Sequence, residues 1–128
     1  MVRASAYVLA AIALGGLFLT ACLARSTAPK PFEGTTTYIV HGYMAGPDDH
    51  WFQWLERKIK SGGGQAVRLA LPQSDDPDPI EWEKVLADKI GTPDRDTYIV
   101  AHSLGSITTL RYLSGLGDAD RLGGLLLV

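Results

Sequence analysis

The sequence predicts an α/β fold in which a parallel sheet lies between two layers of helices, as a three-layer sandwich. Short apolar segments rich in β-branched residues alternate along the chain with longer amphipathic segments. Strands separated by single helices pair in parallel, and the helices then cover both faces of the sheet. The composition, with 46% hydrophobic and 20% charged residues, is typical of a globular domain.

Four segments are expected to form strands, because each is short, apolar and bounded by turn-forming residues. They cover residues 35–40, 65–71, 97–100 and 123–128. The last of them reads GGLLLV and contains no charged residue that would protect the edge of a sheet.

Three segments between these strands are expected to form helices, at 48–61, 78–90 and 103–114. The first has Asp48 or Asp49 as its expected N-cap. The second has Asp78 as its N-cap and Pro79 in its first turn, an arrangement that starts helices. The expected buried residues are Trp51, Trp54, Leu55, Lys58 and Ile59 in the first helix, and Trp82, Val85, Leu86 and Ile90 in the second.

The first 21 residues have the pattern of a secretory signal. After Arg3, no charged residue occurs until Arg25, and small residues lie near the end of the apolar run. The segment 19–22, Leu-Thr-Ala-Cys, resembles the lipobox of bacterial lipoproteins, which implies cleavage before Cys22 and a lipid on that residue. The protein would then be anchored on the extracytoplasmic side of a membrane. An uncleaved membrane anchor and a plain signal peptide are the alternatives.

Composition excludes several other function classes. The net charge of −2 gives no reason to expect a nucleic-acid partner. Cys22 is the only cysteine, so an internal disulfide is impossible and a cysteine-based metal cluster is not expected. The three glycines at 62–64 lack the spacing of a phosphate-binding loop, which disfavours a nucleotide site. We expect neither a metal nor an organic cofactor.

The third strand leads directly into a serine and then a helix. Residues 101–105 read Ala-His-Ser-Leu-Gly, close to the G-x-S-x-G pattern that holds the nucleophile of α/β-hydrolases. Ala101 replaces the first glycine, and Gly105 keeps the second small position. The helix N-terminus would direct free amides at the site, and the Leu104 N–H would stabilise an oxyanion. A helix-capping role for Ser103 is the alternative.

The loop after the first strand has the residues of an oxyanion loop. His41 ends the strand, Gly42 permits a sharp turn, and the N–H of Tyr43 or of Met44 would pair with that of Leu104. Adjacent parallel strands end at one edge, where open α/β sheets place their sites. His41 is expected to brace this loop by hydrogen bonding.

Three stretches, at 41–55, 71–86 and 98–113, together resemble the small serine hydrolases typified by retinoblastoma-binding protein 9. This resemblance covers about residues 35 to 128 and implies an α/β-hydrolase fold with a Ser-Asp-His triad. Ser103 matches the nucleophile of that family, and Tyr43 and Leu104 match its oxyanion positions. The chain then divides into a signal peptide (1–21), a tether (22–34) and a hydrolase domain (35–128).

The rest of the triad is missing from this chain. α/β-Hydrolases carry their triad in the chain order serine, acid, histidine, but no histidine follows Ser103. Asp118 and Asp120 are expected at the opposite end of the sheet, a strand length of roughly 17 Å from the serine. The apolar segment 123–128 favours a domain truncated at its C-terminus. Without an acid and a histidine the chain is expected to be almost inactive.

The remaining histidines and the tryptophans have structural readings. His50 is expected in a loop or first helical turn, with a substrate-pocket role as the alternative. His102 points away from the neighbouring Ser103 in the expected turn and is assigned to packing. The three tryptophans, at helical spacing, are expected in the core.

These features together predict a lipid-anchored, carboxylesterase-like serine hydrolase. It would cleave a small-molecule ester, thioester or amide through an acyl-enzyme on Ser103. A membrane-anchored, non-catalytic binding protein on the same scaffold is the main alternative. A flavodoxin-like nucleotide binder is disfavoured, because the loop after the first strand has no phosphate-binding pattern.

The lipid anchor can be tested by metabolic labelling with a fatty-acid analogue. We expect the protein to incorporate the label and Cys22→Ser to lose it, because no other residue carries a thiol. Persistent labelling of Cys22→Ser would refute the lipobox assignment.

Overall fold

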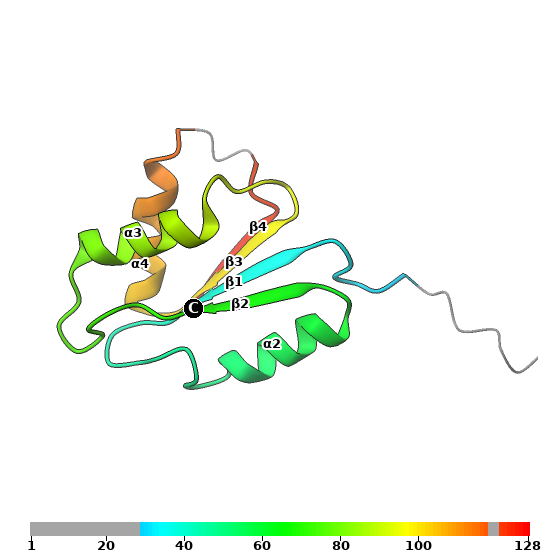
Figure 1. The fold of residues 1–128 in the computed structure, drawn as a ribbon, viewed down its shortest axis with the longest axis horizontal. Helices are drawn as coiled ribbons and strands as arrows, with labels where there is room; N and C mark the ends of the chain where they lie inside the picture. Colours follow the sequence, from blue (N-terminus) through cyan, green and yellow to red (C-terminus); the bar gives the residue numbers. More distant parts are fainter. Residues whose placement is uncertain (1–28, 118–120) are drawn as a thin grey trace, which may run out of the picture.

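A computed structural model describes residues 29–117 and 121–128 of the protein (Figure 1). Cys22 and the proposed signal segment lie outside the described residues, as do Asp118 and Asp120. Within the described part of the chain, no helix has the length and apolar character needed to cross a membrane.

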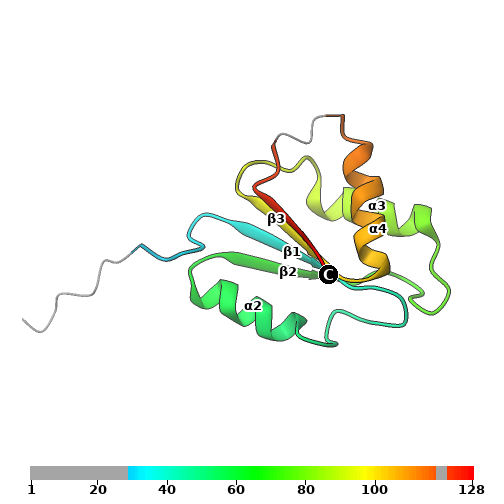
Figure 2. The same ribbon diagram turned by 180° about the vertical axis from the view of Figure 1, so that it is seen from behind.

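Four parallel strands form one sheet in the order β2-β1-β3-β4. Their bounds are β1 Thr36–Val40, β2 Gln65–Leu69, β3 Thr97–Ala101 and β4 Gly124–Leu127. Three helices connect them: α2 Phe52–Ser61, α3 Pro79–Ile90 and α4 Leu104–Ser114. Helix α2 covers one face of the sheet and α3 and α4 cover the other, as the two opposite views show (Figures 1 and 2). The predicted α/β sandwich is therefore confirmed.

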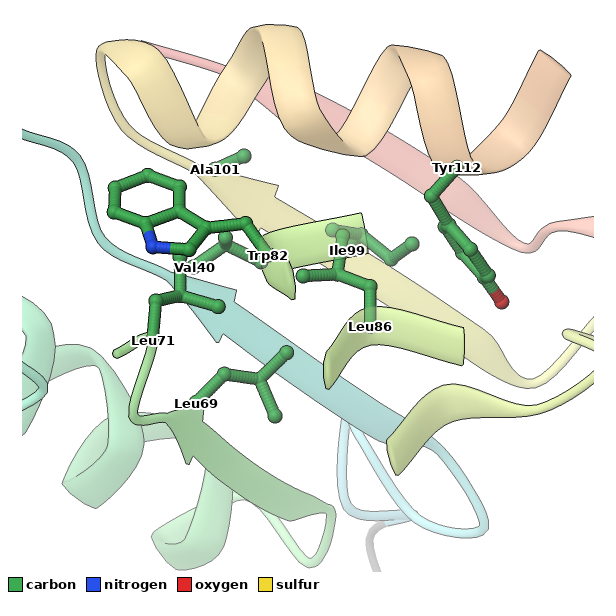
Figure 3. Close-up of a cluster of buried hydrophobic side chains, with 8 residues drawn as sticks. All are labelled: Val40, Leu69, Leu71, Trp82, Leu86, Ile99, Ala101 and Tyr112. Carbon is green, nitrogen blue, oxygen red and sulfur yellow. The ribbon is translucent and has the colours of Figure 1, made fainter. Parts of the chain in front are cut away.

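The main core lies between the sheet and helices α3 and α4 (Figure 3). Trp82 and Leu86 of α3 are almost fully buried against the sheet. The Trp82 indole also donates a hydrogen bond to the carbonyl of Pro72, 2.7 Å away, which ties α3 to the loop after β2. The buried cluster consists of Val40, Leu69, Leu71, Trp82, Leu86, Ile99, Ala101 and Tyr112.

Helix α3 begins as its sequence predicts. The carboxylate of Asp78 accepts hydrogen bonds from the backbone N–H groups of Ile80, at 2.7 Å, and Glu81, at 3.2 Å. Pro79 follows in the first turn, where its missing N–H costs nothing. Local capping chemistry therefore fixes the start of the helix without tertiary help.

The predicted start of α2 is wrong, and its predicted buried face is only partly right. The helix begins at Phe52, and neither expected cap residue serves it, since Asp48 pairs with Arg68 and Asp49 accepts from the Gly46 N–H at 2.7 Å. Phe52 and Ile59 are buried, whereas Trp54 is 53% exposed. Ile59 is thus buried as predicted and Leu55 is half-buried, whereas the predicted burial of Trp54 and Lys58 is wrong.

Arg68 of β2 explains why the segment before α2 is not helical. Its guanidinium contacts the carboxylates of Asp48 and Glu56 and donates to the carbonyl of Pro47 at 2.7 Å. These contacts lower the pKa of Asp48, with the hydrogen bond from Arg68 as the first cause. The β1–α2 loop is thereby held against the edge of the sheet.

Strand β4 forms an exposed edge of the described sheet. Leu125, Leu126 and Leu127 are 38%, 57% and 41% exposed. Their side chains alternate between the two faces, so both faces are open at this strand. An apolar strand exposed in this way is the uncovered edge that the sequence predicts.

Candidate active site

Ser103 lies exposed at the carboxyl end of β3, in a strained turn. Its backbone has φ 54° and ψ −125°, a conformation that residues with a side chain rarely adopt and that costs about 1–3 kcal/mol. It occupies the N-cap position of α4, but its side chain makes no capping hydrogen bond. This backbone conformation thus places the hydroxyl at the carboxyl end of the sheet, where it does not cap the helix.

Backbone hydrogen bonds to both neighbouring strands hold this turn. The His102 N–H donates to the carbonyl of Val40 at the end of β1, at 2.9 Å, and the Ser103 N–H donates to the carbonyl of Val128 at 2.7 Å. The Ser106 hydroxyl donates to the carbonyl of Ala101 at 3.1 Å. The position of the serine is therefore set by the sheet and not by its own side chain.

Two glycines allow the loop after β1 to pack directly against the turn that holds Ser103. A Cβ on Gly42 would stand 2.8 Å from the Cβ of Ser103 and 3.2 Å from the Leu104 nitrogen. A Cβ on Gly105 would collide with the carbonyl oxygen of His41. The small residue expected at position 105 is thus required by close backbone packing, and any side chain at 42 would displace the turn.

Two backbone N–H groups beside Ser103 are free to bind an anion. Among the described residues, the N–H groups of Tyr43 and Leu104 have no hydrogen-bond partner. The Met44 N–H, the alternative to Tyr43 in the sequence prediction, donates to the carbonyl of Ser74 at 2.7 Å and is not available. The positive end of the α4 dipole adds to the same field, and no acidic residue lies in the first turn of α4.

His41 is buried under the loop and uses both ring nitrogens. Its Nε2 lies 2.9 Å from the Leu71 nitrogen, and its Nδ1 lies 3.0 Å from the Gly42 oxygen. Its ring packs edge-on against Trp82, with the ring centroids 5.7 Å apart. The expected bracing of the loop by His41 is therefore present, and it extends to α3.

His102 and His50 lie in an aromatic cluster with residues at the start of α2. The His102 ring lies 5.1 Å from that of His50, 5.9 Å from that of Phe52 and 6.3 Å from that of Trp51, measured between centroids. Its Nδ1 is buried and has no hydrogen-bond partner among the described residues. His102 thus packs as predicted, and His50 is an exposed loop residue with φ 54°.

Only one of the three tryptophans is fully buried in the core, where all three are expected. Trp82 is buried, Trp51 is half-buried in the aromatic cluster, and Trp54 is exposed. The Lys58 Nζ lies 5.9 Å from the centroid of the exposed Trp54 ring.

No general base contacts Ser103 in the described part of the chain. Its hydroxyl forms no hydrogen bond with any residue that the structure describes. The same residues contain no group of three or more histidine, cysteine, aspartate or glutamate side chains placed to bind a metal ion. Among the described residues, the exposed Ser103 hydroxyl and the two free backbone N–H groups therefore have no hydrogen-bonded proton acceptor beside them.

A small, mostly apolar cavity is lined in part by Leu104. It has a volume of about 100 Å³ and lies between the start of α3 and the first turns of α4. Its walls are Pro77, Pro79, Trp82, Leu104, Ile107, Thr108 and Arg111.

Comparisons with known proteins agree with this geometry. The family model described as "Serine hydrolase" matches residues 37–128. The protein named "Putative hydrolase YdeN" of Bacillus subtilis (strain 168) is 41% identical over 91 residues, which are 71% of this chain and 48% of that protein. The crystal structure of the ydeN gene product from B. subtilis is 37% identical with a TM-score of 0.67, covering 73% of this chain and 50% of that one. This chain spans about half the length of both.

The two-backbone contact can be tested with a pair of glycine substitutions. We expect Gly105→Ala to lower the free energy of unfolding by about 1–3 kcal/mol, because the new methyl group meets the His41 carbonyl. Gly115→Ala is the control: residue 115 ends α4 with φ −78°, and its Cβ would lie 3.5 Å from the nearest atom. We expect its effect to stay within about 1 kcal/mol. Urea unfolding measures both, and equal losses would contradict the contact.

Proposed function

The chain belongs to the serine hydrolase family, and we propose on this premise that Ser103 is its nucleophile in ester, thioester or amide hydrolysis. The observation that carries the proposal is the strained, exposed Ser103 beside two free backbone N–H groups. A serine that only caps a helix would use its hydroxyl to bind the helix amides, and Ser103 does not.

In the proposed reaction, the Ser103 hydroxyl attacks the carbonyl carbon of the substrate and gives its proton to a general base. The carbonyl oxygen becomes an oxyanion, stabilised by the N–H groups of Leu104 and Tyr43 and by the α4 dipole. Collapse of this intermediate breaks the bond to the alcohol, thiol or amine, which leaves with the proton. Water then cleaves the acyl-enzyme and restores the serine. None of these steps requires a metal or an organic cofactor.

The general base and its acid are proposed to lie in sequence equivalent to the part of the relatives that this chain does not match. Two observations support this: no described residue hydrogen-bonds to the Ser103 hydroxyl, and the chain matches only about half of each relative. The 128 residues alone are then expected to turn over substrate very slowly, because losing triad members costs roughly 10⁴-fold or more in kcat.

We propose a small, apolar acyl group as the preferred substrate part, because Leu104, which carries one of the two free N–H groups, also lines a small cavity between α3 and α4. Its walls include the side chains of Pro77, Pro79 and Ile107, and its volume is about 100 Å³. An enzyme of this kind would act as a carboxylesterase on short-chain esters. A closer relation to the group typified by retinoblastoma-binding protein 9, and attachment to a membrane through Cys22, belong to the same proposal.

One observation favours the second candidate, a non-catalytic binding protein on the same scaffold. The free N–H groups of Tyr43 and Leu104 can bind an anionic or carbonyl oxygen whether or not a base is present. The two candidates differ in whether Ser103 becomes acylated when sequence equivalent to the unmatched part of the relatives is supplied.

The test is a chimera in which residues 29–128 are followed by the sequence of the B. subtilis relative that lies beyond its match to this chain. We expect a fluorophosphonate probe to label the chimera on Ser103, and we expect Ser103→Ala to lose the label, as read by peptide mass spectrometry. Ser114→Ala, which changes an exposed serine at the other end of α4, should keep it. The 128-residue chain alone should label far more slowly.

Equal labelling of the chimera and its Ser103→Ala variant would refute the nucleophile assignment. Fast labelling and turnover by the 128 residues alone would refute the proposed need for a base from elsewhere. A folded chimera without any labelling would favour the binding protein.

A further inference from the structure

The hydrogen bonds of His41 assign the tautomer of its ring. The Leu71 N–H points at Nε2 from 2.9 Å, and a backbone N–H can only donate. Nε2 must therefore be the unprotonated nitrogen that accepts, and the ring proton is on Nδ1. Nδ1–H then donates to the Gly42 carbonyl oxygen 3.0 Å away.

The Gly42 carbonyl belongs to the same peptide unit as the Tyr43 N–H. The described chain contains no cis peptide bond, so the carbonyl and the N–H of this unit point in opposite directions. Because His41 is buried at 1% exposure, the carbonyl is held toward the interior. The Tyr43 N–H is consequently held on the outer side, where it has no partner among the described residues.

We propose that His41 is a positioning residue that aims the Tyr43 N–H at the substrate oxygen by holding the carbonyl of that peptide unit. The inference rests on the proposed role of this N–H in the oxyanion hole. His41 contacts no reacting atom. It acts through Gly42, and the Leu71 N–H in turn fixes which of its nitrogens carries the proton.

Glycine at position 42 makes such control necessary. A glycine peptide can rotate more freely than others, and a flipped Gly42–Tyr43 unit would present a carbonyl to the oxyanion in place of a donor. The next N–H, of Met44, is already fixed by the Ser74 carbonyl at 2.7 Å. His41 on one side and Ser74 on the other thus leave a single peptide unit, in one orientation, facing the site.

Two substitutions of His41 test whether it orients the Gly42–Tyr43 peptide or only fills space in the core, because each keeps one of its two hydrogen bonds. The amide N of His41→Asn can replace the Nδ1 donor to Gly42 but leaves the Leu71 N–H unpaired. The amide O of His41→Gln can replace the Nε2 acceptor but leaves the Gly42 carbonyl free to turn. In the chimera, we expect His41→Gln to lower kcat for p-nitrophenyl acetate. The loss of one oxyanion donor sets the upper limit of this effect, at roughly 10²–10³-fold.

The proposal requires His41→Gln to lose at least about tenfold more kcat than His41→Asn, with KM changed far less than kcat. The free energy of unfolding should rank the variants in the opposite order, with His41→Asn the less stable, since it leaves a buried N–H unpaired. If His41→Gln keeps kcat equal to or above that of His41→Asn, or if kcat follows stability in both, His41 is only structural.

A second measurement needs neither a variant nor activity. The ¹⁵N chemical shifts of the His41 ring in the unchanged 128-residue chain report which nitrogen carries the proton. A proton on Nδ1 is expected, and a proton on Nε2 would overturn the proposal. Absence of turnover in the unchanged chimera would contradict the proposed function itself, and the ring tautomer would still decide the orientation of the Gly42–Tyr43 peptide.

Discussion

The close approach of two backbones, at His41 and at Gly105, is the constraint on which the rest of the site depends. Helix α4 can start directly against the end of β1 only because residue 105 has no side chain to meet the His41 carbonyl. The same approach brings Gly42 against Ser103 and places the Leu104 N–H beside the loop. The proposed nucleophile and the proposed oxyanion donors thus come together from the ends of two neighbouring strands through backbone packing.

Backbone strain is concentrated at the edge of the sheet that carries this contact. The residues other than glycine with positive φ in the described chain are Met44, His50, Gln73 and Ser103. All of them lie in loops that follow the carboxyl ends of β1, β2 or β3. In the described parts of the loops at the amino ends of the strands, positive φ occurs at glycines such as Gly63 and Gly91, where it costs little. The buried core beneath α3 and α4 offsets this strain. Strained backbone conformations that cluster at one end of a sheet in this way are typical of functional sites.

The sequence predicts most of this architecture because much of it is local. The Asp78 cap, the Ala101-to-Gly105 turn and the alternation of strand and helix are all encoded by neighbouring residues. The start of α2 could not be predicted in the same way, because Arg68, far along the chain, takes the Asp48 carboxylate that local rules assign to a cap. For the same reason, only the fold shows that Ser74 occupies the Met44 N–H and leaves that of Tyr43 free. The pairing of His41 with Leu71 likewise depends on a contact between separate loops.

The most direct test of the central claim is a crystal structure of the chimera with a phosphonate bound covalently at the site. The account predicts phosphorus bonded to the Ser103 Oγ, and a phosphoryl oxygen about 2.7–3.1 Å from the backbone nitrogens of both Leu104 and Tyr43. A phosphoryl oxygen turned away from both nitrogens, or an adduct on another residue, would contradict it.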